Sequence, residues 1–180
     1  MQESAEFFTR ERYGSALRED GTPHLDHIRG VVTRVKGLGV SDPQVIAAAW
    51  LQGIINDSKA TFDEIDQRFG SSVSVMVMAL SLDKSVPRKE AERRYDRQVS
   101  EAPAVVQVLK LCDISTSFKE LKNSTLSRNR KNKKMRKEVH YLLLMRHGLS
   151  GSKSQFPGIE SILGGINETI SAHGQRPVSF

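Results

Sequence analysis

Imidazole, carboxylate and guanidinium side chains gather in a few short stretches of an otherwise helical-looking sequence. Residues 18–27 read REDGTPHLDH, residues 47–58 read AAAWLQGIINDS, and residues 108–118 read VLKLCDISTSF. These side chains are the types that bind phosphate, hold a divalent metal ion or move a proton during hydrolysis. The three stretches are therefore the first candidates for a binding or catalytic site.

The size and composition of the chain predict one globular domain. At 180 residues a single core can close without disulfides. The lone Cys112 excludes an internal disulfide and a multi-cysteine metal cluster, as is typical of a reducing compartment. No run of about 18 apolar residues occurs, and the first residues, MQESAEFFTRERYG, lack the apolar core of a signal peptide. We expect a cytoplasmic protein that does not enter a membrane.

Positive charge is concentrated in one segment of the chain. The net charge is +6, and one stretch of ten residues carries seven cations: Arg128, Arg130, Lys131, Lys133, Lys134, Arg136 and Lys137. Such a block can bind nucleic acid or another polyanion by neutralising phosphates. Because no aromatic residues are interleaved, we favour a solvated, lysine-rich loop and helix start, and polyanion binding is the alternative.

Helix signals dominate the first half of the chain. Asp42 before Pro43 offers an N-cap and a first-turn proline, and Thr61 with Glu64 forms the pattern of a capping box. Gly70 can end the helix that follows this box. Gln52 and Asn56 lie four residues apart, so one helical face would let them hydrogen-bond to each other. These signals favour helices that present their polar side chains at one corner.

The second half of the chain also reads as helical. Residues 71–84 are ambiguous between a strand and a buried helix, and their neighbours favour a helix. Further helices are predicted over 87–100, 103–121, 131–147 and 158–172, with a glycine- and serine-rich joint at 148–152. We predict an all-α bundle over residues 1–150, and a C-terminal helix and tail over 151–180 that pack on it or trail from it.

The motifs as an ordered series resemble a known family. REDGTPHLDH, AAAWLQGIINDS, TFDEIDQRFGSSV at 61–73 and VLKLCDISTSF follow one another as in the HD-domain hydrolases of the RelA/SpoT type. The likeness is nearest to their small stand-alone members of the metazoan SpoT-homologue type, and it runs from about Ala5 to Leu121. It implies an HD-domain helical bundle. It also implies removal of pyrophosphate from the 3′ position of guanosine tetra- or pentaphosphate, with a Mn²⁺-type ion.

The resemblance also implies a set of metal ligands. The family's first His corresponds to His27 and its last Asp to Asp113, whereas its central His-Asp pair falls on Gln52 and Gly53. Glutamine offers only a neutral amide oxygen, and glycine offers no side chain. Half of the ligand set is therefore missing, and we expect no cofactor. Mn²⁺ would bind only if His24, three residues before His27, helped to rebuild the site with His27, Asp57 and Asp113.

Other positions in the same corner also depart from the family. Asn56-Asp57 stands where the family has Glu-Asp, and an amide cannot act as a general base. Glu19, Ile114 and Ser117 replace a Lys, an Arg and an Asn of the family. The candidate ligand-binding residues that remain are Arg18, His24, His27, Gln52, Asn56, Asp57, Asp113 and Ser117.

Structural roles remain open for several of these residues. His27 can be a hydrogen-bonded structural histidine, and Asp113 can be held by His27 or Arg18. Arg18 can grip a phosphate or stack on a purine, or it can pair with Asp20 or Asp26 at the surface. These alternatives need no bound ligand.

The departures lead to one main functional hypothesis. It is a protein that has lost metal-dependent pyrophosphohydrolase activity and serves as a nucleotide-sensing or protein-binding module. The alternative is a (p)ppGpp 3′-pyrophosphohydrolase, or a related phosphohydrolase acting on a nucleotide such as NADPH, with a rebuilt metal site. The second alternative is nucleic-acid or polyanion binding through residues 128–137.

Overall fold

The computed structural model describes residues 2–179, and in this part of the chain the regular elements are all helices. In chain order they are α1 (Gln2–Tyr13), α2 (His24–Gly37), α3 (Pro43–Leu51), α4 (Ile54–Asp57), α5 (Phe62–Phe69), α6 (Ser71–Ala79), α7 (Arg88–Glu101), α8 (Ala104–Asn123), α9 (Arg128–Gly151) and α10 (Ile159–Ala172). The predicted all-α class is confirmed. No helix among these residues is both long and apolar enough to cross a membrane.

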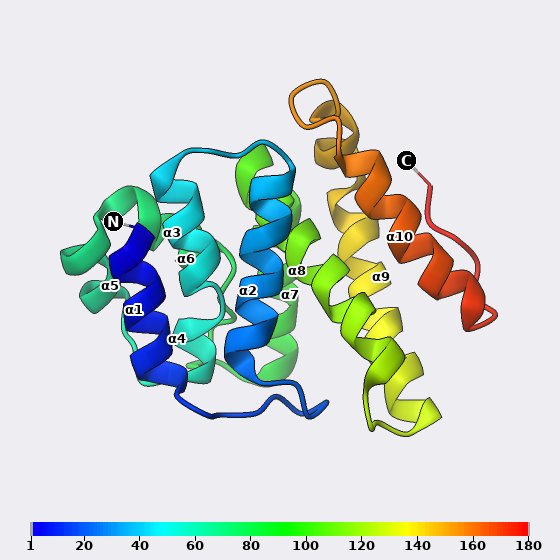
Figure 1. Ribbon diagram of the computed structural model, residues 1–180, viewed down its shortest axis with the longest axis horizontal. Coiled ribbons are helices and arrows are strands. Elements are labelled where there is room, and N and C mark those ends of the chain that lie inside the picture. Colours follow the sequence, from blue (N-terminus) through cyan, green and yellow to red (C-terminus); the bar gives the residue numbers. More distant parts are fainter. Residues whose placement is uncertain (1, 180) are drawn as a thin grey trace.

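Helix α8 is the centre of the bundle. It packs on α2 along one side and on α9 and α10 along the other. Figure 1 shows α1, α3, α5 and α6 grouped beyond α2, with α9 and α10 at the opposite end of the molecule. The polar residues of α8 therefore face helices from both halves of the chain.

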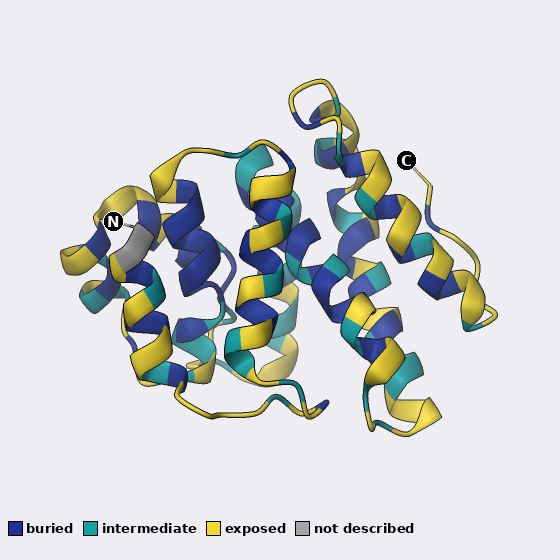
Figure 2. Ribbon diagram, in the orientation of Figure 1, coloured by how far each residue is buried: buried dark blue, intermediate teal, exposed yellow. Residues whose placement is uncertain are grey.

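Helix α3 is buried along its whole length from Val45 to Leu51, because its side chains are apolar on every face. Figure 2 shows it among the darkest segments of the bundle. Asp42 caps the helix by accepting a hydrogen bond of 2.8 Å from the backbone N–H of Gln44. The helix ends at Leu51, because Gly53 adopts a left-handed φ of +79°. The polar corner that follows is thus a sharp turn into α4.

The capping box at Thr61 is present in the structure. Its hydroxyl accepts a hydrogen bond of 3.2 Å from the backbone N–H of Glu64. Gly70, with φ of +88°, ends α5 at the predicted place. The ambiguous segment after it forms a helix, α6, over Ser71–Ala79.

The last helices differ in their bounds from the prediction. Helix α9 begins at Arg128, capped by Ser127, and continues to Gly151. The basic segment is therefore helical from its first residue, and most of the predicted glycine-rich joint belongs to α9. Gly148 lies in this part of α9 and packs closely on α8, where an added Cβ would lie 1.9 Å from Oε1 at the end of the Gln107 side chain.

The predicted division after residue 150 falls within the last turn of α9. Helix α10 packs on α8. The division into residues 1–150 and 151–180 stays a prediction, and its two end residues, Met1 and Phe180, lie outside the described residues.

Candidate functional site

A pocket of about 280 Å³ lies where α2, α4, α8 and α9 meet. It brings together every ligand-binding residue that the sequence suggested: Arg18, His24, His27, Gln52, Asn56, Asp57, Asp113 and Ser117. Further lining residues that the sequence reasoning missed are Tyr13, Tyr95, Lys110, Glu138 and Tyr141, and Lys137 of the predicted basic segment also lines the pocket. The pocket therefore combines basic, acidic and aromatic groups from both halves of the bundle.

One wall of the pocket is a chain of alternating charges. Lys110 Nζ donates a hydrogen bond of 2.7 Å to Asp113 Oδ2, and His27 Nε2 lies 2.9 Å from Asp113 Oδ1. The other ring nitrogen, His27 Nδ1, lies 3.0 Å from both carboxylate oxygens of Glu120. Arg18 Nη1 then donates to Glu120 Oε2 at 2.8 Å. Each carboxylate of the chain is thus held between two cationic or protonatable groups.

The charges of this wall stabilise one another. Burial alone would lower the pKa of His27, but its hydrogen bonds to Asp113 and Glu120 outweigh burial and raise it. Burial alone would raise the pKa of Asp113, but Lys110 and His27 hold it well below its ordinary value. The Asp113 carboxylate likewise outweighs burial and raises the pKa of Lys110. With carboxylates at both ring nitrogens, His27 is held as an imidazolium.

The partner of Arg18 differs from the surface pairs suggested by the sequence. Arg18 pairs with Glu120, at the far end of α8, rather than with Asp20 or Asp26. Asp20 is instead held by Lys134 of the basic segment. The reason is topological, since the loop that carries Arg18 lies against α8, which the local sequence does not reveal.

The opposite wall carries groups that can accept a proton. His24 stacks on Tyr13 with ring centroids 4.5 Å apart and planes 7° from parallel. Burial lowers the pKa of His24 by more than the nearby charge of Asp57 raises it, so the imidazole is neutral at pH 7. Its ring makes no hydrogen bond within the described part of the chain. A neutral imidazole and the carboxylate of Asp57 are both suited to accept a proton from water.

The predicted hydrogen bond between Gln52 and Asn56 is wrong. Asn56 Nδ2 donates to the carbonyl of Leu82 at 2.8 Å, and the Leu82 N–H donates to Asn56 Oδ1 at 2.8 Å. Both ends of the Asn56 amide are therefore taken by the segment after α6. Gly53 also breaks the helix between the two residues, so they do not share a helical face.

Two buried acceptor atoms of the pocket have no hydrogen-bond partner among the described residues. They are Gln52 Oε1 and Glu138 Oε2. Buried polar atoms are nearly always paired, so two unpaired ones at one pocket need an explanation. A ligand with N–H or O–H donors would satisfy them.

The metal ion implied by the resemblance does not fit these residues. Both ring nitrogens of His27 face carboxylates, and both oxygens of Asp113 face cationic groups. In the described part of the chain, no three or more His, Cys, Asp or Glu side chains converge so that they could hold an ion. This includes the set suggested for a rebuilt site, His24, His27, Asp57 and Asp113. As folded, these residues do not offer a metal site.

Some of the missed residues had a signal in the sequence. Lys110 precedes Asp113 by three residues and Glu120 follows it by seven, so all three share one face of α8. Glu138 and Tyr141 had none, because their place beside α8 depends on how α9 packs on it.

The basic segment divides among several environments. Lys137 lines the pocket, Lys134 holds Asp20, and Arg130 lies 3.8 Å from Glu19. Arg128 and Lys131 line a separate hollow beside the end of α10. Polyanion binding by residues 128–137 stays a prediction.

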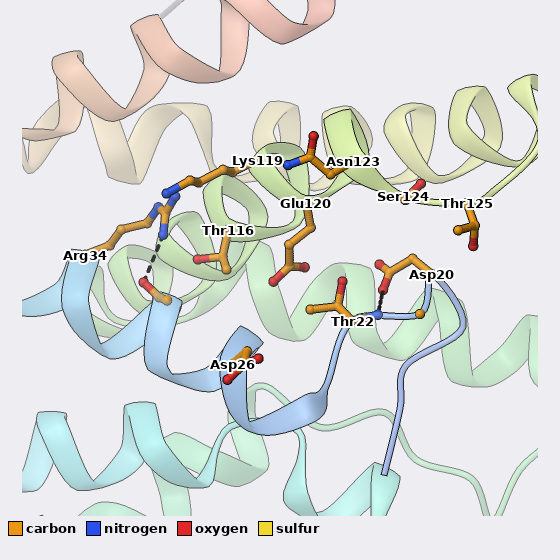
Figure 3. A pocket seen from close by; sticks show the side chains of 12 residues that line it. Asp20, Thr22, Asp26, Arg34, Thr116, Lys119, Glu120, Asn123, Ser124 and Thr125 are labelled. Atoms are coloured by element: carbon orange, nitrogen blue, oxygen red, sulfur yellow. Dashed lines mark hydrogen bonds between the residues drawn. The ribbon is translucent and has the colours of Figure 1, made fainter. Parts of the chain in front are cut away.

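A second pocket, of about 410 Å³, lies on the other side of Glu120 (Figure 3). Asp20, Thr22, Arg34 and Lys119 are among its lining residues, and Figure 3 shows Glu120 reaching in from α8. None of the ligand-binding residues suggested by the sequence lines this pocket.

Comparisons with known proteins identify a matching family model and several similar proteins. The HD domain family model matches residues 5–114. Guanosine-3′,5′-bis(diphosphate) 3′-pyrophosphohydrolase MESH1 of Danio rerio is 30% identical over 121 residues, covering 66% of this chain and 67% of the relative. The protein of the same name from Homo sapiens is 28% identical over 127 residues, covering 69% and 71%.

A solved structure of a metazoan ortholog of SpoT, described as hydrolysing ppGpp and playing a role in starvation responses, has the same fold. It covers 97% of this chain and 96% of its own, with a TM-score of 0.82 and 19% identity.

These comparisons overturn the main functional hypothesis from the sequence, a sensing or binding module without hydrolase activity. The relatives that match this chain over two thirds of its length are named as pyrophosphohydrolases. That hypothesis assumed that catalysis requires the family's metal ligands at Gln52 and Gly53 and its carboxylate at Asn56. The comparisons favour the alternative, a phosphohydrolase.

The resemblance to RelA/SpoT-type proteins, nearest to the metazoan SpoT homologues, is confirmed by the relatives and by the fold. The matched family model spans more than half of the residues and includes most of α1, all of α2 to α7 and the first half of α8. The chain belongs to the HD-domain family.

Proposed function

We propose that this chain is a phosphohydrolase that removes pyrophosphate from the 3′ position of guanosine 3′,5′-bis(diphosphate) or a closely related nucleotide. The observation that carries the proposal is the pocket between α2, α4, α8 and α9, which gathers cations and proton acceptors on a fold shared with proteins named as such hydrolases. The relatives' names supply the substrate class, and the pocket supplies groups suited to the reaction.

The cations of the pocket suit a phosphorylated ligand. Arg18, Lys110 and Lys137 reach it from the loop before α2, from α8 and from α9. Lys137 is exposed, and its Nζ lies 5.9 Å from the centre of the Tyr141 ring, so it can swing toward a bound phosphate. Phosphoryl transfer depends mainly on positioning and on stabilising the charge of the phosphoryl oxygens, which such cations provide.

The proton acceptors suit the attack of water. In the proposed reaction a water oxygen bonds to the phosphorus attached to the ribose 3′ oxygen, and the bond from that phosphorus to the 3′ oxygen breaks. The proton lost by water passes to His24 or Asp57, and the protonated base, directly or through solvent, returns a proton to the 3′ oxygen as it leaves. The products are pyrophosphate and a nucleotide with a free 3′ hydroxyl.

The unpaired acceptor atoms of the pocket suit the ribose and guanine of a nucleotide. Gln52 Oε1 and Glu138 Oε2 lie buried with lone pairs but no donors. Ribose hydroxyls and the N–H groups of guanine are donors of the required type. Binding would remove the penalty of leaving these acceptors unpaired.

The test is release of pyrophosphate from guanosine 3′,5′-bis(diphosphate) by the purified protein, with NADPH as the comparison nucleotide. We expect release by the unmodified chain and a loss of about 10²-fold or more in His24→Asn or Asp57→Asn, whichever residue accepts the proton. His147→Asn, an exposed change on α9 away from the pocket, is the control. No release from either nucleotide by the unmodified chain would refute the proposal.

A further inference from the structure

The atoms of His27 and Asp113 are already committed to other groups. Nδ1 of His27 faces Glu120, and Nε2 faces Asp113, so neither nitrogen presents a free lone pair to the pocket. Asp113 uses Oδ1 toward His27 and Oδ2 toward Lys110. A metal ion could bind to these two residues only by displacing a cation from each.

Lys110 is built into this position. Its side chain is buried, with 8% of the residue exposed, and Nζ lies 5.0 Å from the centre of the Tyr141 ring as well as 2.7 Å from Asp113. Tyr95 contributes a second ring, at 5.9 Å. Ion pairing with a carboxylate and contact with aromatic faces both stabilise a buried ammonium. The packing of three helices therefore fixes a positive charge beside Asp113.

Gly53 gives an independent reason why position 53, which corresponds to the Asp of the family's His-Asp pair, supplies no metal ligand. Its φ is +79°, a conformation that residues with a Cβ rarely adopt. A Cβ added there would also lie 3.0 Å from Asp57 Oδ2 and 3.6 Å from Tyr13 Oη. The backbone conformation at this turn thus suits a residue that has no side chain.

The charges of the wall leave positive groups facing the ligand. Along the series Lys110, Asp113, His27, Glu120 and Arg18, cationic groups stand at both ends, and carboxylates stand only between them. Lys137 adds a further cation from α9, on the side of Lys110. Cations fixed at a water-poor wall bind phosphate oxygens more strongly than exposed ones do.

We infer that this pocket binds the phosphate groups of its ligand with the protein's own cations, Lys110 foremost, and without a divalent metal ion bridging them to His27 and Asp113. The inference rests on the proposed function in taking a phosphorylated nucleotide as the ligand. It departs from the metal ion that the family resemblance implies.

Two titrations test the inference directly. The first adds Mn²⁺ alone to protein purified without chelator, and we expect no saturable binding near one ion per chain. The second adds inorganic pyrophosphate in the presence of EDTA and again with Mn²⁺ in excess over the pyrophosphate. We expect pyrophosphate to bind in EDTA. Its affinity should rise by no more than about threefold when Mn²⁺ replaces EDTA. Stoichiometric Mn²⁺ binding, or pyrophosphate binding that disappears in EDTA, would overturn the inference.

Variants test where pyrophosphate binds. Lys110→Met should abolish pyrophosphate binding in EDTA, but it leaves Asp113 short of one partner and can weaken the fold. Lys137→Met avoids that difficulty because Lys137 is exposed. It should weaken binding by about tenfold, whereas Lys36→Met, an exposed change in the last turn of α2 that does not line the pocket, should leave it unchanged. Equal binding by the Lys137 and Lys36 variants would contradict the placement of the site.

The inference and the proposed function can fail separately. Pyrophosphate binding in EDTA together with no hydrolysis of guanosine 3′,5′-bis(diphosphate) would support the metal-free site and refute the activity. Hydrolysis that needs Mn²⁺, with Mn²⁺ bound stoichiometrically, would support the activity and refute the metal-free site.

Discussion

His27 stands between two carboxylates, with Nε2 2.9 Å from Asp113 Oδ1 and Nδ1 3.0 Å from both oxygens of Glu120. This arrangement joins α2 to two points of α8, seven residues apart, at the core of the pocket. A buried imidazolium that satisfies two carboxylates acts at once as a structural link and as part of the charge presented to a ligand.

His27→Ala should strongly destabilise the fold, because it removes the group shared by Asp113 and Glu120 and leaves each of these largely buried carboxylates with one cation, Lys110 or Arg18, in place of two partners. Breaking a buried ion pair costs about 3–5 kcal/mol in free energy of unfolding. The control is His140→Ala, since His140 makes a similar contact of 3.0 Å to Asp96 but is half exposed, and it should cost about 1 kcal/mol or less. Denaturant unfolding of both variants measures the difference, and equal losses would contradict the structural role of His27.

Asp20→Asn should make the free energy of unfolding less dependent on pH at acidic pH. Burial alone would raise the pKa of Asp20, but hydrogen bonds from Lys134 and from the backbone of Thr22 lower it. A lowered folded-state pKa stabilises the protein above the unfolded pKa of about 3.9, and this contribution is lost as pH falls through the folded-state value.

The variant should therefore be less stable than the unmodified chain at pH 7, by about 1–3 kcal/mol. The gap should close progressively as the pH is lowered below about 4. Thermal unfolding at pH 7 and at pH 3 tests this. A stability difference that is the same at both pH values would show that the ion pair between Asp20 and Lys134 is not its source.

Cys112 should be unreactive in the folded protein. Burial raises the pKa of its thiol to about 12, and the side chain, which belongs to α8, is fully buried. Iodoacetamide at pH 8 should leave the native protein unmodified over a time in which the denatured protein is fully alkylated. Mass spectrometry of both samples gives the result, and rapid modification of the native chain would mean that α8 opens readily.

Gly53→Ala should destabilise the turn between α3 and α4. The left-handed backbone and the contact of 3.0 Å to Asp57 Oδ2 together should cost about 1–2 kcal/mol. Gly164→Ala is the matched control, because Gly164 lies inside α10 with open space at the Cβ position, and it should stabilise by about 0.5–1 kcal/mol. Changes of the same sign in the two variants would argue against a strained turn at Gly53.

The sequence predicted the helices well because their signals are local. The caps at Asp42 and Thr61 and the stop at Gly70 all act within one turn of chain. The start of α9 at Arg128 and its continuation through Gly148 to Gly151 were missed.

The fold brings the suggested ligand-binding residues together, but the sequence did not predict the contacts that they make. Every suggested ligand-binding residue reaches one pocket, because the motifs are ordered along helices that meet there. The partners of Arg18 and Asn56 were wrong, since Glu120 and Leu82 lie 102 and 26 residues away in sequence. Local spacing does not determine contacts of that range.

The most direct test of the account is the release of pyrophosphate from guanosine 3′,5′-bis(diphosphate) in EDTA, compared with release when Mn²⁺ replaces the chelator. We expect the purified chain to release pyrophosphate in both conditions at similar rates, and Lys137→Met to slow release whereas Lys36→Met does not. Release that occurs only with Mn²⁺, or no release in either condition, would contradict it.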